Sequence, residues 1–338
     1  MSAVTGIAAS VNPHVRRRWR ETDPLLPEPG VPPPGCGAEF VLAGPDGGPA
    51  AVATCEHWVG EPGSLDPSWG TPRRFQLAAQ IAGPRIGGTL DRLLAQWRDH
   101  LAGVPGTDGD DTAAVVTWPC RDIDGAAALV RRGLAPLAVV GARATGRHPG
   151  GPAGHAAAAD GRAGGTGPAA ALARQGVRIR RAEPADLDAV VRLGVEVIRF
   201  DAHFGNGGVR PDTMAALRGE AAAMLAGPQP WTWLAERDGA AIGLLAAQRP
   251  DLAGWIAPLV RPAPVAYLML MFVQPGERAG GIGAELAARL HADAEAAGVP
   301  VVLLHYQTLN PLSAPFWSQQ GYRPLWLTWE ARPARALR

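Results

Sequence analysis

Lysine is absent from this chain, and all 32 of its Lys+Arg residues are arginine. A phosphate-binding loop of the Walker type needs a Gly-Lys pair, so that class of nucleotide site is excluded. A charge excess of one sign is missing too, because the formal net charge is +1. Without a strong field of either sign, the chain has no electrostatic reason to bind nucleic acid or an anionic membrane, and we expect neither as a partner.

Cysteine is scarce as well. Cys36, Cys55 and Cys120 are widely spaced and lie in the first half of the chain. No pair has metal-ligand spacing, so we expect buried thiols rather than a metal site or a disulfide framework. No apolar run is long enough to cross a membrane, and the first arginines follow the weakly apolar start of the chain, the reverse of a secretory signal. We therefore expect a cytoplasmic protein.

What the chain does contain is a strand, a glycine loop and a helix in succession at residues 267–297. Residues 267–273, YLMLMFV, are apolar and suit a strand buried on both faces. Pro275 and Gly276 end that strand, and Leu286 and Leu290 then recur at helical spacing. The loop between them consists of Arg278, Ala279, Gly280, Gly281, Ile282 and Gly283.

A loop of this kind can bind an anion. The first amides of a helix have no partner within it, and they point outward at the positive end of the helix dipole. Gly281 and Gly283 would let a phosphate approach the backbone closely. An ordinary strand-to-helix turn is the alternative. A dinucleotide fold does not fit, because the acidic residue expected about 20 positions further on is replaced by the apolar residues 301–304.

The segments that follow carry a family resemblance. A second apolar strand at residues 301–306 leads to Asn310, a short segment through Trp317, and the pair Gly321 and Tyr322. Together with the spacing of Arg278, Gly281 and Gly283, this order resembles the GNAT superfamily of acyl-CoA-dependent N-acyltransferases over residues 176–330. The resemblance implies an α/β (α+β) fold, acetyl-CoA as co-substrate and an amine as acceptor. The chain departs from the family at Trp317, where many members have a tyrosine.

The first half of the chain repeats this pattern weakly. At an offset of 193 residues, Arg85 aligns with Arg278, Gly88 with Gly281, and Leu90 with Gly283. At an offset of 188, residues 122–133 align with residues 310–321. We therefore expect two tandem GNAT-like domains, each with a mixed, mostly antiparallel sheet flanked by helices. The first copy is degenerate, since Leu90 puts a side chain where phosphate would meet the backbone.

The expected boundaries follow from composition. Residues 1–37 contain a proline-rich piece and are expected to form a flexible arm, followed by a degenerate domain at 38–147. Residues 148–175 are rich in Gly, Ala and Pro and predict a linker. The resemblance implies that residues 176–332 form an acetyltransferase domain.

The resemblance also implies roles for particular residues. The backbone of Met271, Phe272 and Val273 would pair with the pantetheine arm, the loop at residues 278–283 would bind the pyrophosphate, and Asn310 would lie on the far side of the cleft. The candidate acceptor contacts are Asp201, His203 and Phe204, in the glycine-rich segment at residues 200–208.

Three residues are candidates for catalysis. His305 and Tyr306 end the second strand, and alternation predicts that at most one of them faces the cleft. His305 has the better intrinsic pKa for a base. Trp317 cannot be a general acid, because its indole N–H does not ionise at useful pH, but it can cover the thioester or donate a hydrogen bond.

Two functions stand as hypotheses at this point. The first is an N-acetyltransferase that transfers an acetyl group to a primary amine of a small molecule or peptide, acting as a monomer or homodimer. The second is a non-catalytic acyl-CoA-binding sensor or assembly protein, in which Trp317 marks a lost active site.

Overall fold

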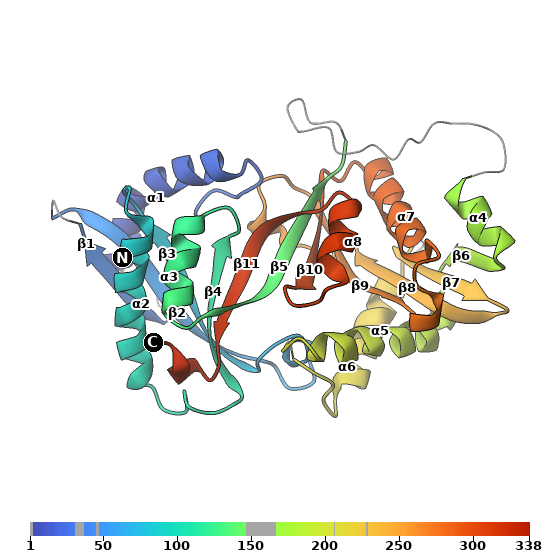
Figure 1. Ribbon diagram of the computed structural model, residues 1–338, viewed down its shortest axis with the longest axis horizontal. Coiled ribbons are helices and arrows are strands. Elements are labelled where there is room, and N and C mark those ends of the chain that lie inside the picture. The colour runs from blue at the N-terminus through green and yellow to red at the C-terminus, as the bar shows by residue number, and fades with distance from the viewer. Residues whose placement is uncertain (1–2, 31–36, 45–46, 147–166, 206, 228) are drawn as a thin grey trace.

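The protein is described here by a computed structural model, which covers residues 3–30, 37–44, 47–146, 167–205, 207–227 and 229–338. In these residues, eleven strands form one continuous sheet, with helices on both of its faces (Figure 1). The α/β fold class is thereby confirmed. Most of the predicted linker at residues 148–175 lies outside the described residues, although residues 168–174 form a helix.

The strands are β1 (Ala38–Ala43), β2 (Pro49–Val59), β3 (Arg73–Ile81), β4 (Thr112–Pro119), β5 (Ala135–Ala144), β6 (Val177–Arg181), β7 (Thr232–Arg237), β8 (Ala240–Gln248), β9 (Val265–Val273), β10 (Val301–Gln307) and β11 (Arg323–Ala331). The helices are α1 (Ala3–Thr22), α2 (Ile86–Ala102), α3 (Ile123–Arg131), α4 (Pro168–Arg174), α5 (Leu187–Ala202), α6 (Thr213–Leu225), α7 (Ile282–Ala296) and α8 (Ser313–Gln319). None of these helices combines the length and hydropathy that a bilayer crossing requires.

The two halves of the chain exchange their last strands. The strand order is β1-β2-β3-β4-β11-β5-β10-β9-β8-β7-β6. β11, from the second half, therefore lies between β4 and β5 of the first half, and β5 pairs with β10 of the second (Figure 1). All three of these pairings are antiparallel. The predicted segments 38–147 and 176–332 are thus joined in one sheet, in which each segment pairs with the last strand of the other.

Each face of the sheet has its own helices. On face 1, α2 and α3 cover the first half and α7 and α8 the second, as shown by the cores around Trp97 and Leu290. On face 2, α1 packs on β2 and the helices α5 and α6 pack on β8 and β9. Leu327 of β11 contacts the cores of both halves on face 1, so the exchanged strand joins them.

The expectation of a flexible arm at residues 1–37 is wrong for residues 3–26. Residues 3–22 form α1, which packs on β2 through a stripe of fully buried side chains, Ala8, Val11 and Val15. Beyond the helix, the buried carboxylate of Asp23 accepts hydrogen bonds from the guanidinium of Arg323. The three buried positions are three and four residues apart, as on one side of a helix, but their side chains are small and the hydrophobic signal is weak.

The repeat alignment needs one correction. α2 begins at Ile86 and α7 at Ile282, so the helices match at an offset of 196 rather than 193, and Leu90 does not occupy the position of Gly283. Instead, the loop before the first helix is short, with residues 82–85 in place of residues 274–281. The first copy therefore lacks the phosphate loop because it lacks four residues. The offset of 188 holds further on, since Gly133 and Gly321 both have φ of +84°.

We predict that the two halves do not fold independently. Chains 1–146 and 167–338, produced separately, should each aggregate, because β10 loses β5 and β11 loses both of its neighbours. Mixed during refolding, they should form a 1:1 complex, measured by light scattering after gel filtration. A monodisperse, folded chain 167–338 on its own would contradict this prediction.

Candidate active site at the parting of two strands

Strands β9 and β10 part in the middle of the sheet. They pair in parallel from Val265 opposite Val301 to Leu268 opposite Leu304, and no further. At this point β9 also carries a bulge against β8, where Ala246 pairs with Leu270 and Ala247 with Leu268. The extra residue is Met269, and a bulge of this kind bends a strand and increases its twist. Beyond Leu268, β9 therefore presents backbone groups that have no partner in β10.

The bulge also changes which side chains face which side of the sheet. Before it, Leu268 packs in the core of face 1, and after it Leu270 packs on face 2, with Met271 back on face 1. Phe272 contacts the core of face 2. Met271 and Phe272 thus lie on opposite sides of the parted strand.

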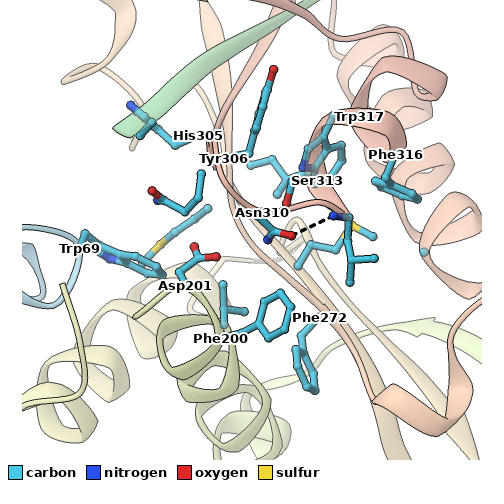
Figure 2. Close-up of a pocket in the computed structure, with 18 of the residues that line it drawn as sticks. Trp69, Phe200, Asp201, Phe272, His305, Tyr306, Asn310, Ser313, Phe316 and Trp317 are labelled. Atoms are coloured by element: carbon cyan, nitrogen blue, oxygen red, sulfur yellow. Dashed lines mark hydrogen bonds between the residues drawn. The ribbon is translucent and has the colours of Figure 1, made fainter. Parts of the chain in front are cut away.

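The parting opens a cavity of about 700 Å³. Its lining includes Met271, Phe316 and Trp317 from face 1 and Phe200, Asp201 and His305 from face 2. Figure 2 shows Trp69 and Asp201 on one side of this cavity and Phe316 and Trp317 on the other, with Asn310 between them. A molecule in the cavity can therefore be reached from both faces of the sheet.

The glycine loop enters α7 at one wall of the cavity. Gly281 is the N-cap residue with φ of +89°, and its carbonyl accepts the amide hydrogen of Glu285 at 3.1 Å. The amides of Ile282, Gly283 and Ala284 precede this first helical bond and have no partner within the helix.

The two glycines differ in what a side chain at each position would meet. Gly281 has open space around it but adopts a left-handed conformation that disfavours a side chain. A Cβ on Gly283 would lie 2.8 Å from Cε of Met271 and 3.4 Å from the ring of Phe316. The nearer of these atoms is the flexible end of the Met271 side chain, so a side chain at this position would require Met271 to shift.

Arg278 ties the loop to the end of β9. Its Nε donates to the carbonyl of Val273 at 3.0 Å, and its guanidinium lies 5.3 Å from the ring centroid of Phe200 and 5.7 Å from that of Phe272. The guanidinium is thus held where the loop, β9 and α5 meet.

Asn310 and Asp201 connect the two sides of the cavity. Oδ1 of Asn310 accepts the amide hydrogen of Leu312 at 3.0 Å (Figure 2), and the side chain of Asn310 lies close enough to the carboxyl of Asp201 to lower its pKa. Burial raises the pKa of Asp201 to about 6, and Asn310 only partly opposes this effect. Asp201 therefore changes charge close to neutral pH.

His305 faces the cavity in a neutral form. Its ring has accessible surface there, yet it lies deep enough for burial to lower its pKa to about 4. Nδ1 of His305 lies 3.0 Å from Oη of Tyr267, whose pKa is raised by burial and by the charge of Asp201. The buried phenol keeps its proton and donates it to Nδ1, because a buried donor needs a partner. Nε2 then carries the ring hydrogen and is a donor.

Tyr306 and Trp317 belong to face 1. Both are largely buried, and the ring of Trp317 meets those of Phe316 and Tyr322 edge-on at centroid distances of 4.8 and 5.4 Å. His305 and Tyr306 do point to opposite faces, as alternation predicts. The expectation that only one of them faces the cleft is nevertheless wrong, since the cavity is lined from both faces and contacts both residues.

Of the three predicted acceptor contacts, only Asp201 lines the cavity. It belongs to α5, which continues to Ala202 where the glycine-rich sequence predicts a loop. His203 is exposed, and its Nδ1 lies 2.9 Å from the carbonyl of Arg199. Phe204 packs edge-on against Phe200 at 5.3 Å.

Sequence reasoning missed the wall contributed by the first half. Asp66, Trp69, Gly70, Thr71 and Arg74 all line the cavity. The loop that carries them is anchored to the connection between α5 and α6, where the amide of Gly208 donates to the carbonyl of Ser68 at 3.1 Å and Nε of Arg210 donates to that of Pro67 at 2.8 Å. These contacts join residues more than 130 positions apart, and no local pattern marks them.

No cluster of three or more potential metal ligands occurs in the part of the chain that the structure describes.

The geometry agrees with comparisons to known proteins. Residues 204–322 match the model of the Acetyltransferase (GNAT) family. This segment is a GNAT domain. It contains the parted strands, the glycine loop and Asn310, so the resemblance seen in the sequence is confirmed. No curated protein matches the chain in sequence.

Several solved structures align with nearly the whole chain. A GCN5-related N-acetyltransferase from Sphaerobacter thermophilus is 14% identical, with a TM-score of 0.55 over 97% of this chain and 92% of that one. A tandem GNAT protein from the clavulanic acid biosynthesis pathway is 16% identical, with a TM-score of 0.40 over 98% and 95%. A GCN5-related N-acetyltransferase from Kribbella flavida is 14% identical, with a TM-score of 0.42 over 98% and 96%. Of these three similarities, the first establishes that the fold extends beyond the GNAT domain to both halves.

We predict that Asp201 destabilises the fold near neutral pH. Its folded-state pKa of about 6 lies above the ordinary carboxyl value of about 4, so the cost of ionisation is absent below pH 4 and complete above pH 6. Asp201→Asn should raise the free energy of unfolding at pH 7.5 by on the order of 2 kcal/mol and leave it unchanged at pH 4. Denaturant titrations at the two pH values measure this difference.

A control is available on the same helix. Asp188 is exposed and pairs with Arg218, so Asp188→Asn should change stability by less than about 0.5 kcal/mol. An equal gain from both variants, or a gain from Asp201→Asn that persists at pH 4, would show that burial of the Asp201 charge is not the cause.

Proposed function

We propose that the protein is an N-acetyltransferase that transfers an acetyl group from acetyl-CoA to a primary amine. One observation carries this proposal. The cavity at the parting of β9 and β10 joins the amino end of α7 on one side to the carboxylate of Asp201 on the other. An anionic donor and an amine can thus meet from opposite faces of the sheet.

The residues present fit an acyl-CoA. Past Leu268, the backbone of Met271, Phe272 and Val273 has no partner in β10, so an extended pantetheine arm can pair there as an added strand would. The loop formed by Arg278, Ala279, Gly280, Gly281, Ile282 and Gly283 offers helix-terminal amides and open space around Gly281 for the pyrophosphate. Asn310 closes the opposite side. When bound, acetyl-CoA supplies an activated thioester carbonyl.

Asp201 is our candidate for the proton acceptor. An amine loses a proton as it attacks a thioester, and a base with a pKa near 6 is ionised at neutral pH and ready to receive it. His305 is less suitable, because Nδ1 accepts from Tyr267 and Nε2 carries a hydrogen. In this arrangement His305 acts as a hydrogen-bond donor that orients the acceptor.

Trp317 covers the reacting centre in this proposal. Its indole is largely buried between Phe316 and Tyr322 and cannot donate a proton to the leaving thiolate. Tyr306 lines the same side and holds its proton, because burial raises its pKa. The two residues together exclude water from the thioester.

The proposal predicts a pH-dependent reaction. With acetyl-CoA and a panel of primary amines, thiol release should rise as pH increases through about 6, where Asp201 ionises. Asp201→Asn should lower kcat by roughly 10² to 10⁴-fold and remove this acidic limb. Thiol release is followed by a colorimetric reagent, with Asp188→Asn as the control.

The same experiment addresses the rival function. A non-catalytic acyl-CoA-binding protein would bind acetyl-CoA but release no thiol with any amine at any pH. That outcome would reject the transferase proposal and leave a binding role.

We predict one acyl-CoA site per chain. Gly281→Asp should abolish binding, because it places a negative charge where the pyrophosphate is expected to lie. Gly88→Asp in the first half should have no effect, since Gly88 is exposed and the loop before α2 is four residues shorter. Calorimetry with CoA measures both. Two equivalent sites per chain, or loss of binding in Gly88→Asp, would contradict the prediction.

A further inference from the structure

The cavity contains an arginine that has no partner of its own. Arg74 of β3 lines the end of the cavity built by the first half, and its guanidinium carbon lies 3.7 Å from the ring centroid of Trp58. Within the described part of the chain, this guanidinium makes no hydrogen bond and no ion pair, and its Nε is buried without an acceptor. A guanidinium held against an aromatic ring with its donors unused is prepared to bind a planar anion.

The acidic groups near Arg74 do not fill that role. Asp66 and Glu330 are close enough to favour its charged form, but neither reaches ion-pair distance. Glu330 is already engaged, since it accepts from Oγ1 of Thr71 at 3.0 Å and pairs with Arg332 at 2.9 Å. Asp66 is exposed to solvent.

At the other end of the cavity, Asp201 is a negative group without a positively charged partner. Its side-chain partner is the neutral amide of Asn310, and no arginine or histidine pairs with it in the described residues. A single cavity thus holds an unpaired carboxylate and an unpaired guanidinium. Burying or half-burying a charge costs free energy unless a charge of opposite sign lies beside it. A ligand with the opposite charge at each end would offset that cost for both groups.

The two charges are well separated. Asp201 is on α5, close enough to Tyr267 to raise the pKa of its phenol, and Oη of Tyr267 lies 3.0 Å from Nδ1 of His305 on β10. From Arg74 on β3 to His305 on β10 the sheet takes four strand steps, through β4, β11 and β5, which amounts to roughly 19 Å at about 4.8 Å per step. Each intermediate strand contributes a small or short side chain to the cavity wall: Val115, Thr328 and Ala138. The side chains of Arg74 and Asp201 shorten the distance between the two charged groups, but a ligand that contacts both must still be many bonds long.

From this arrangement, and resting on the proposed transferase function, we infer that the acceptor is an elongated molecule with a primary amine at one end and a carboxylate at the other. The amine lies at Asp201, the carboxylate binds Arg74, and the chain between them follows the wall formed by Val115, Thr328 and Ala138. An α-amino acid, with one carbon between its two groups, is too short to reach both.

The test compares acceptors that differ only in the carboxylate. A series of straight-chain ω-amino acids of increasing length is measured against n-alkylamines of matched length, with the α-amino acid glycine as the shortest member. Above a threshold length, the wild-type protein should prefer the amino acid over its matched amine by about 10- to 100-fold in kcat/KM, because a charge-assisted hydrogen bond adds that much. The difference should appear mainly in KM.

Variants of neighbouring arginines locate the effect. Arg74→Gln should abolish the preference while leaving the rate with alkylamines and the affinity for CoA unchanged, and Arg74→Lys should restore part of it. Arg73→Gln is the matched control, since Arg73 is the adjacent residue, does not line the cavity and lies beside Asp111. Equal kcat/KM for amino acids and matched amines in the wild type, or equal effects of the Arg73 and Arg74 variants, would overturn the inference.

Direct binding of the amino acids tests the carboxylate site separately from the transferase activity. If no amine releases thiol, the same compounds are titrated into CoA-saturated protein by calorimetry. Long ω-amino acids should then still bind at least tenfold more weakly to Arg74→Gln than to the wild type. Absence of binding, or binding that Arg74→Gln does not weaken, would reject the carboxylate site in either case.

Discussion

The site depends on the separation of β9 from β10 beyond Leu268. A parallel pair that remained joined would close the sheet at this point and leave no space between its faces. The bulge at Met269 turns β9 away, but β10 needs a reason to stay in place once it has lost that neighbour. β5 provides it, because it pairs with β10 along its whole length, with Val140 opposite His305 and Ala138 opposite Gln307. The opening is therefore held by a strand from the other half of the chain.

This explains how a half without a phosphate loop contributes to the site. The short loop at residues 82–85 leaves the first half without the long glycine turn that precedes α7. Yet the same half supplies β5, the loop with Trp69 and the strand with Arg74. Its sheet positions the second half, and its side chains line the region that the acceptor is proposed to occupy.

How far the sequence predicted the structure depends on the range of the interactions. The strand, loop and helix at residues 265–296 are local, so their spacing sufficed, and the 188-residue offset identified the matching elements further on. The start of α2 was misplaced by three residues, because a shortened loop shifts the register without changing composition. α1 was missed because Ala8, Val11 and Val15 are small and Pro13 lies within the helix.

In the candidate site, too, local features could be predicted from the sequence and long-range contacts could not. Gly281, Gly283 and Asn310 could be named from a contiguous motif, and Asp201 was named too, although its place on a helix was not foreseen. Trp69 and Arg74 could not be found, since strand exchange and loop docking bring them to the cavity from over 100 residues away. The strand exchange also imposes an order on folding. β11 is synthesised after the other ten strands of the sheet, yet it fills the space between β4 and β5. Until β11 has been synthesised, both of those strands carry open edges, so the sheet of the first half cannot be completed before that of the second.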